Sequence, residues 1–269
     1  MFISLMESPM RIPVRGIHLN VLDQGSGSPA LVFLHYFGGS AHTWDEVASR
    51  LARSARCIAI DHRGWGESDA PAQGYGIADL AADAQSVIET LQLDAFVLVG
   101  HSMGGKVAQW LASRRLRGLR GLVLVAPSPA GSTDVGDAQR EALVHAYDSP
   151  DSIAFVRDNI LTARPLSDAL KARVERDSLR GATAARIGWP MVAMREDFSD
   201  KLGRIDVPVL VICGDCDQVD TVDVVRREVV QRIPGASLRV LPGVGHLSPL
   251  EAPAELASEI ETFIAGARA

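Results

Sequence analysis

Two residues of this sequence are of the types used in nucleophilic catalysis, and both lie in segments that can expose a side chain. Ser102 stands in Gly100-x-Ser102-x-Gly104, and His246 stands in a loop rich in glycine and proline at residues 242–249. A serine hydroxyl is nearly inert at neutral pH, so it needs a base to take its proton and an acid to orient that base. The pattern therefore predicts nucleophilic attack by Ser102 with His246 as the base. A turn histidine bonded to backbone is the alternative interpretation of His246.

Three aspartates in residues 214–220 are candidates for the orienting acid. This segment directly follows an apolar run at residues 209–213, so its side chains lie at the end of a predicted strand. Asp217 is the preferred candidate. Asp215 is interpreted as a solvated turn residue, and Asp220 is expected to cap the helix that follows.

The stretch around Ser102 predicts a sharp corner between a strand and a helix. Residues 95–99 form an apolar run of strand length, and residues 106–114 have helical spacing. Only glycine leaves room for the neighbouring backbone at such a corner. The helix start supplies free N–H groups beside the serine hydroxyl, which favours a developing negative charge there. Taken alone, the stretch is also compatible with an ordinary glycine-rich turn.

Apolar strands alternate with amphipathic helices along much of the chain. This alternation predicts an α/β fold with a mostly parallel sheet and helices on both faces. An antiparallel pair is expected at residues 12–22. The expected strands are residues 30–34, 56–60, 95–99, 121–126, 209–213 and 238–241, and the runs at 30–34 and 56–60 are expected to be buried.

The alternation stops after Pro127 and resumes near residue 203. We therefore expect a core domain from residues 1–128 and 203–269, with a helical cap inserted at residues 129–202. The cap contains helical patterns and no convincing strand. Its expected helices are residues 138–147, 152–161, 167–179 and 184–195.

Composition argues against several other classes of function. The chain has 269 residues, 47% of them hydrophobic, and a formal net charge of −6, which disfavours a nucleic-acid partner. No apolar run reaches membrane-spanning length, and residues 1–6 lack the features of a signal peptide. Three cysteines form no disulfide framework, so a cytoplasmic setting is expected. No zinc or nucleotide signature is present, and we expect no metal, no cofactor and a monomer or homodimer.

Several motifs in order make the chain resemble the α/β-hydrolase superfamily, in the branch of small esterases, cofactor-free haloperoxidases and carbon–carbon bond hydrolases. The resemblance covers nearly the whole chain. Besides the Ser102 corner, it rests on His35-Tyr36-Phe37-Gly38-Gly39, Asp61-x-Arg63-Gly64-x-Gly66-x-Ser68, Gly214-Asp215-Cys216-Asp217 and Gly245-His246-x-x-Pro249-x-Glu251-x-Pro253.

The resemblance implies an eight-stranded sheet and a set of residue roles. Ser102 would be the nucleophile, His246 the base and Asp217 the acid, with the backbone N–H groups of Phe37 and Met103 as the oxyanion hole. The motif from Asp61 to Ser68 is expected to fix a loop and to take no part in catalysis.

Other residues are candidates for the substrate pocket. Tyr36 stands where the family usually has glycine, so it either narrows the site, bonds substrate through its phenol, or packs internally. His101 adjoins the nucleophile and is expected to be held by packing and backbone bonds. In the cap, Trp189, Met191, Met194 and Phe198 either line an apolar pocket roof or pack within the cap itself, since both are compatible with their helical spacing.

The expected activity is hydrolysis of a small carboxylic ester, a lactone or a related acyl substrate of apolar character, through an acyl-enzyme. Carbon–carbon bond hydrolysis, perhydrolysis of the haloperoxidase kind and hydroxynitrile lyase activity use the same three side chains and stay open. A ligand-binding receptor on this fold is the alternative outside enzymology.

Overall fold

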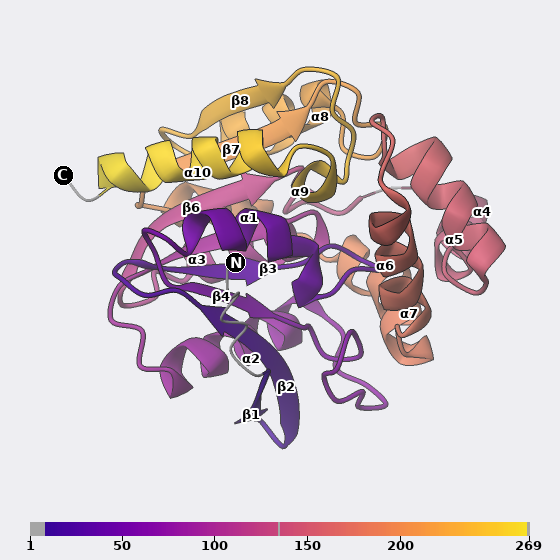
Figure 1. The fold of residues 1–269 in the computed structure, drawn as a ribbon, viewed down its shortest axis with the longest axis horizontal. Helices are drawn as coiled ribbons and strands as arrows, with labels where there is room; N and C mark the ends of the chain where they lie inside the picture. The colour runs from indigo at the N-terminus through magenta and orange to yellow at the C-terminus, as the bar shows by residue number, and fades with distance from the viewer. Residues whose placement is uncertain (1–8, 134, 268–269) are drawn as a thin grey trace, which may run out of the picture.

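The computed structural model describes residues 9–133 and 135–267, and it is built around one eight-stranded sheet (Figure 1). The strand order is β1-β2-β4-β3-β5-β6-β7-β8. The pairs β1·β2 and β2·β4 are antiparallel, and all later neighbours are parallel. The predicted mostly parallel α/β sheet is therefore confirmed. Its strands are β1 (Met10–Val14), β2 (Ile17–Gln24), β3 (Ala30–Leu34), β4 (Cys57–Ile60), β5 (Phe96–His101), β6 (Leu119–Val125), β7 (Val209–Gly214) and β8 (Ser237–Leu241).

The central strands are apolar along their whole length because helices cover both faces of the sheet. In β3, every residue is buried, and alternate side chains enter two different cores. Leu31 and Phe33 pack on one face with helices α1 and α10, whereas Val32 and Leu34 pack on the other with α2 and α3. The edge strand β8 is largely exposed. The core helices are α1 (Asp45–Leu51), α2 (Ile77–Thr90), α3 (Met103–Ser113), α8 (Val222–Glu228), α9 (Ser248–Glu251) and α10 (Pro253–Ala267), with the 3₁₀ turns η1 (Ala41–Trp44) and η5 (Val230–Arg232).

Between β6 and β7, the described residues form helices and no strand, as the sequence pattern predicts. These helices lie together at the right of Figure 1, beyond one end of the sheet. Their bounds are α4 (Asp137–Val144), α5 (Pro150–Val156), α6 (Asp168–Leu179) and α7 (Thr183–Met191), with the π-helical turn η2 (Arg157–Leu161) and the 3₁₀ turns η3 (Ala193–Arg195) and η4 (Ser199–Arg204).

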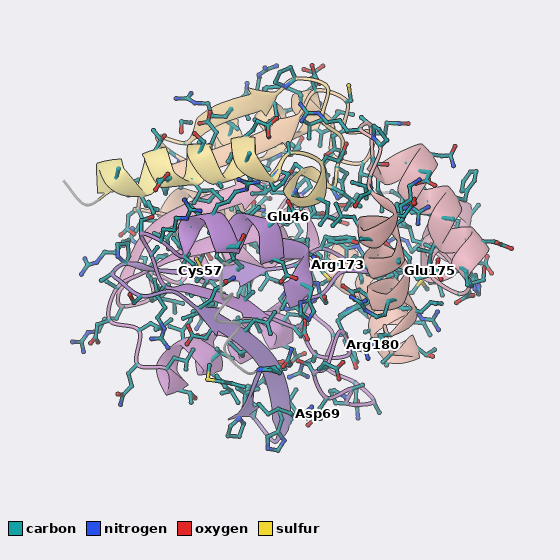
Figure 2. The ribbon with its side chains drawn as sticks, in the orientation of Figure 1. Glu46, Cys57, Asp69, Arg173, Glu175 and Arg180 are labelled. Atoms are coloured by element: carbon teal, nitrogen blue, oxygen red, sulfur yellow. The ribbon has the colours of Figure 1, made fainter. Side chains whose placement is uncertain are left out.

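This helical segment contacts the loop that follows β3 through buried hydrogen bonds. The Tyr147 hydroxyl donates to the carbonyl oxygen of Phe37 at 2.8 Å, and the Ser178 hydroxyl donates to that of Gly38 at 2.8 Å. Arg173 of α6 is labelled in Figure 2. Its guanidinium pairs with the Asp45 carboxylate at 3.1 Å. The helices therefore lie over the carboxyl end of β3, next to the corner that carries Ser102.

Candidate active site

Ser102 occupies a strained corner between β5 and α3. Its φ of 51° and ψ of −113° lie in a region that side-chain-bearing residues rarely adopt. A Cβ on Gly100 would collide with the carbonyl oxygen of Gly104, and one on Gly104 would collide with that of Leu34. Both glycines are therefore required by backbone contacts. Such strain at a single serine marks a candidate functional position.

His246 and Asp217 are joined by a buried hydrogen bond. The Nδ1 atom of His246 lies 2.9 Å from an Asp217 carboxylate oxygen, and both side chains are almost inaccessible to solvent. They come from the loops after β8 and β7, whose carboxyl ends share one edge of the sheet. Because a carboxylate only accepts, Nδ1 donates the proton. The Nε2 atom is then the nitrogen available to act as a base.

The second Asp217 oxygen is held by backbone donors. It accepts the N–H groups of Val219 at 2.8 Å and Asp220 at 3.1 Å, which orients the carboxylate toward His246. Asp215 instead accepts the N–H of Gly243 at 2.6 Å and joins the two loops. Among these three aspartates, Asp217 is thus the one with a hydrogen bond to the imidazole.

The surroundings of His246 favour the protonated imidazole more strongly than water does in a free histidine. Burial acts to lower the pKa of His246, but the charge and hydrogen bond of Asp217 outweigh it, and Asp220 and Glu251 add to the rise. The pKa of His246 is therefore raised above its usual value. A base with this environment accepts a proton readily and is stabilised as an imidazolium.

The loops that carry Ser102 and His246 meet at His101. Its Nε2–H donates to the carbonyl oxygen of His246 at 2.8 Å, and the two rings lie 5.2 Å apart. The Ser102 hydroxyl makes no hydrogen bond to a residue in the described ranges. Catalytic hydrogen bonds are often loose without substrate and tighten when it binds.

Two backbone donors beside Ser102 have no acceptor among residues 9–133 and 135–267. They are the N–H groups of Phe37, in the loop after β3, and of Met103, at the first position of α3. Free N–H groups at a helix start favour a negative oxygen. This pair matches the oxyanion hole that the resemblance implies.

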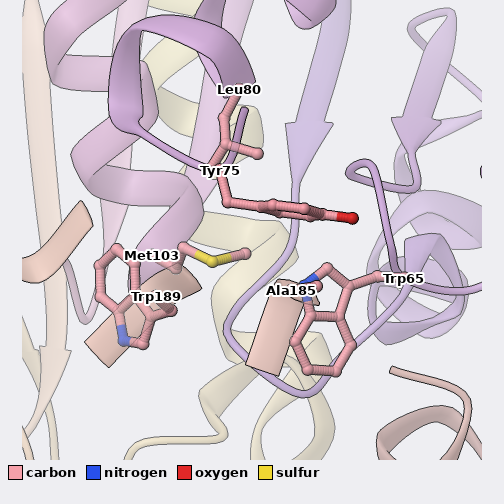
Figure 3. Close-up of a pocket in the computed structure, with 6 residues that line it drawn as sticks. All are labelled: Trp65, Tyr75, Leu80, Met103, Ala185 and Trp189. Carbon is pink, nitrogen blue, oxygen red and sulfur yellow. The ribbon is translucent and has the colours of Figure 1, made fainter. Parts of the chain in front are cut away.

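A small aromatic cavity adjoins Met103 (Figure 3). The rings of Trp65, Tyr75 and Trp189 surround the Met103 side chain, and Leu80 and Ala185 complete the lining. The cavity encloses about 10 Å³, close to the minimum for one water molecule. Its six lining residues carry no formal charge, so the space suits an uncharged apolar group.

Phe37 is enclosed by aromatic rings of the core and the helical segment. Its ring lies 5.4 Å from that of Trp65, 5.0 Å from Tyr147 and 6.3 Å from Trp189. Aromatic pairs at these separations hold one another in place. The residue that carries the candidate oxyanion donor, Phe37, is therefore held in place by the surrounding aromatic rings.

The other expected pocket residues of the helical segment lie elsewhere. Met194 is buried, and its carbonyl oxygen faces the Lys106 side chain at 3.4 Å. Met191 is 43% exposed, and Phe198 packs on Trp110 with ring centres 5.0 Å apart. The roof interpretation is therefore not supported for Met191 and Phe198, because helical spacing does not specify which side of a helix meets the site.

Tyr36 and His101 are buried in contact with each other. Their ring centres lie 5.2 Å apart, and a Cβ on Gly39 would contact the Tyr36 ring at 2.5 Å. Burial raises the pKa of Tyr36 well above its usual value, with Tyr147 and Asp177 adding to the rise. Burial lowers the pKa of His101 well below its usual value, so this imidazole is neutral. These contacts favour the packing interpretation of Tyr36.

The motif from Asp61 to Ser68 organises a loop. Asp61 accepts hydrogen bonds from the Asn20 side chain and from the N–H groups of Ala41 and Glu67, at 2.8, 2.6 and 2.9 Å. Arg63 forms a two-pronged ion pair with Asp83 at 2.6 Å. These bonds are of the structural kind that the sequence analysis expects.

Two residues near the site were not identified as important from the sequence. Lys106 is fully buried, and its ammonium donates to the carbonyl oxygens of Gly131 and Glu196 at 2.9 and 2.8 Å. The signal in the sequence that could have identified Lys106 is that a lysine stands among the apolar positions of α3. Asp220 is buried and does not cap α8, because Thr221 takes that position by accepting the N–H of Val224. The expectation of a capping role for Asp220 is therefore wrong.

The cysteines lack the features of a redox pair. Burial raises the pKa of the Cys213 thiol to about 11, and the hydrogen bond that the Cys216 thiol donates to the Asp215 carboxylate raises the pKa of Cys216. Neither thiol is therefore activated as a thiolate.

In the part of the chain that the structure describes, no group of three His, Cys, Asp or Glu side chains is placed to bind a metal. No helix in that part is long and apolar enough to cross a membrane. Residues 1–6, assessed above as a poor signal peptide, lie outside the described residues.

Comparison with known proteins agrees with this architecture. Residues 29–253 match the family profile of the alpha/beta hydrolase fold. A non-heme haloperoxidase of Rhodococcus erythropolis is 31% identical over 86% of this chain and 90% of its own. The 2-succinyl-6-hydroxy-2,4-cyclohexadiene-1-carboxylate synthase of Serratia proteamaculans is 29% identical over 91% and 96%. An esterase from Exiguobacterium antarcticum superposes with a TM-score of 0.87 at 26% identity, covering 98% of this chain and all of that one. The chain therefore belongs to the α/β-hydrolase fold family.

Proposed function

We propose that this protein is a serine hydrolase that cleaves a small carboxylic ester, or a related acyl substrate such as a lactone, through an acyl-enzyme. The observation that carries the proposal is the buried 2.9 Å hydrogen bond between His246 and Asp217, at the sheet edge where Ser102 sits at positive φ. A carboxylate that fixes the imidazole tautomer is what a serine nucleophile requires.

The reaction proceeds in two acyl-transfer steps. Ser102 attacks the substrate carbonyl while Nε2 of His246 takes its proton, and Asp217 stabilises the imidazolium. The N–H groups of Phe37 and Met103 bind the oxyanion, an interaction worth about 10²–10³ in rate for one donor. His246 then protonates the leaving alcohol. In the second step, His246 activates water, which releases the acid and restores Ser102.

The lining of the cavity supports an uncharged, apolar acyl or alcohol group. Aromatic and aliphatic side chains form the cavity walls. The buried cation nearest to Met103 in the sequence is Lys106, and its ammonium group already donates hydrogen bonds to backbone carbonyl oxygens. A cavity of about 10 Å³ requires movement of its walls to admit substrate. We propose that residues 129–202 form a cap over the site and that its displacement admits the substrate.

A fluorophosphonate probe tests the nucleophile directly. Wild-type protein and Ser113→Ala should be labelled, and Ser102→Ala should not. Ser113 is a suitable control because it lies at the far end of α3 and its hydroxyl bonds only to the carbonyl oxygen of Trp110. The wild type should also hydrolyse p-nitrophenyl esters of short acids, with loss of turnover in Ser102→Ala.

Labelling that survives in Ser102→Ala would contradict the proposal. If the wild type neither reacts with the probe nor hydrolyses any ester, but melts at a higher temperature with small apolar ligands, the receptor alternative holds.

Perhydrolysis is a second candidate because a relative of 31% identity is named a haloperoxidase. In that reaction, hydrogen peroxide replaces water as the attacking group on the acyl-enzyme and releases a peracid. The peracid then oxidises bromide and is itself reduced to the carboxylic acid. Bromination of a dye in acetate with peroxide, lost in Ser102→Ala, would support it.

A further inference from the structure

The turn that follows β3 carries the candidate oxyanion donor Phe37 at its centre. The N–H of Gly39 donates to the carbonyl oxygen of Tyr36 at 3.1 Å, so Phe37 and Gly38 are the two central residues of the turn. Gly38 has a φ of 97°, which glycine adopts without strain. The Nδ1–H of His35 donates to the same Tyr36 oxygen at 2.7 Å. The core therefore holds the peptide group that precedes Phe37.

The next two carbonyl oxygens of the turn are bound from the helical segment. The Tyr147 hydroxyl donates to the oxygen of Phe37 and the Ser178 hydroxyl to that of Gly38, each at 2.8 Å and buried. Among residues 9–133 and 135–267, no backbone N–H donates to either oxygen. A buried carbonyl oxygen needs a donor, so these two hydroxyls determine how the peptide groups after Phe37 are oriented.

Further contacts of the helical segment converge on the same turn. A Cβ on Gly38 would collide with the Tyr147 ring, so the ring lies directly against the turn. The Ser40 hydroxyl, just after the turn, donates to the buried Asp177 carboxylate of α6 at 2.7 Å. Within the segment, Arg186 of α7 donates to the carbonyl oxygen of Tyr147 at 2.8 Å. Tyr147 is therefore fixed to the segment through its backbone and to the turn through its side chain.

We propose that Tyr147 is a positioning residue of the oxyanion hole. Its hydroxyl, together with that of Ser178, fixes the turn that presents the Phe37 N–H, so the hole is complete only while the helical segment is seated on the core. This inference rests on the proposed function. Displacement of the segment to admit substrate releases both carbonyl oxygens, and its return restores the donor. Closure of the site and completion of its machinery are thereby one event.

The effect of Tyr147 should fall on the chemical step. The substrate oxygen carries more negative charge in the tetrahedral transition state than in the bound ester, so a correctly aimed donor lowers the barrier more than it tightens binding. Tyr147→Phe keeps the ring and removes only the hydroxyl. With p-nitrophenyl butyrate, kcat should fall at least about tenfold while KM stays within about twofold. The fall is smaller than the roughly 10²–10³-fold cost of a deleted donor, because the Phe37 N–H is misaligned and not lost.

A pair of inhibitors separates positioning from general damage. Ser102 adds to a trifluoromethyl ketone with the same butyryl chain: its oxygen bonds to the carbonyl carbon, the π electrons move to the ketone oxygen, and His246 takes the proton. Affinity for this ketone should fall in Tyr147→Phe by the same factor as kcat. Affinity for butyramide, whose carbonyl stays trigonal, should be unchanged.

Arg173→Met is the matched control. It breaks the ion pair between α6 and Asp45, a contact of the helical segment with the core that lies outside the turn. The variant should keep the wild-type kcat and the wild-type ratio of the two inhibitor affinities. An unchanged kcat in Tyr147→Phe would overturn the inference. Equal losses for ketone and amide would also overturn it, since they indicate a structural role only. If Tyr147→Phe does not fold, Ser178→Ala carries the same comparison.

The second test does not require turnover. Hydrogen exchange of the Gly39 N–H, which closes the turn, should quicken at least about tenfold in Tyr147→Phe and stay unchanged in Arg173→Met, as measured by NMR. Unchanged exchange in an active esterase would overturn the role of Tyr147. Faster exchange in a protein without any hydrolytic activity would support the coupling of the segment to the turn while rejecting the proposed function, so the two failures are distinguishable.

Discussion

The ammonium group of Lys106 donates a 2.8 Å hydrogen bond to the carbonyl oxygen of Glu196. The same group donates to Gly131 at 2.9 Å. These acceptors lie near the two ends of the helical segment between β6 and β7. One side chain of α3, the helix that begins beside Ser102, thus joins both ends of that segment to the core.

Replacement of Lys106 by methionine should destabilise the protein by about 2–4 kcal/mol, because buried carbonyl oxygens lose their charged donor. Urea denaturation measures the loss. Hydrogen exchange should also quicken in residues 129–133 and 194–197. Lys171→Met, at a partly exposed position on α6, should change the free energy of unfolding by less than about 0.5 kcal/mol. Equal losses in both variants would refute the anchoring role.

Asp217→Asn should leave the fold intact and lower kcat by about 10²–10⁴. An amide can donate to Nδ1 and so favour the wrong imidazole tautomer, and it no longer balances the imidazolium charge. Steady-state kinetics with a p-nitrophenyl ester checks this. Asp215→Asn, which alters the loop contact to Gly243, should have a much smaller effect on kcat. A larger effect at Asp215 would reassign the acid.

The activity of the wild type should decline as the pH falls, with an inflection above 6.5. The base must be neutral to accept the serine proton, and Asp217 raises the pKa of His246 against the opposing effect of burial. The loss on acidification therefore begins at a higher pH than for an unperturbed histidine. Measurement of kcat/KM between pH 5 and 9 tests the sign, and an inflection below 6.5 would contradict it.

Trp189→Leu should shift substrate preference toward longer acyl chains. The indole walls the cavity beside Met103, so its removal makes room for several methylene groups. Because one methylene in such a pocket is worth about tenfold or more, the ratio of kcat/KM for octanoyl over acetyl esters should rise at least about tenfold. Met191→Ala, exposed on the same helix, should leave the ratio unchanged.

Asp220→Asn should stabilise the protein at pH 8 but not at pH 4. Burial raises the pKa of Asp220 in the folded protein to about 7, above its usual 3.8 in an unfolded chain. The folded state therefore binds the extra proton between these values, and its stability falls as the pH rises through this window. The amide removes that cost. Melting temperatures at the two pH values check the difference, and a gain confined to pH 4 would reverse the sign.

Much of the fold was predictable because its signals are local. The continuous apolar run of β3 indicates a strand that is buried on both faces. The glycines at the Ser102 corner indicate close contact between backbone segments. Bounds were less predictable where helices end irregularly. Helix α8, for example, ends at Glu228, and the 3₁₀ turn η5 follows it closely in the chain.

The sequence by itself determined that Ser102, Asp217 and His246 each follow the end of a strand, since strand runs and turn residues are encoded over a few positions. Only the tertiary structure decided that Asp217 bonds to His246, that Asp220 is buried, and that Lys106 joins both ends of the helical segment. The reason is that these contacts link loops distant in the chain, where the direction of each side chain depends on packing between elements and not on neighbouring residues.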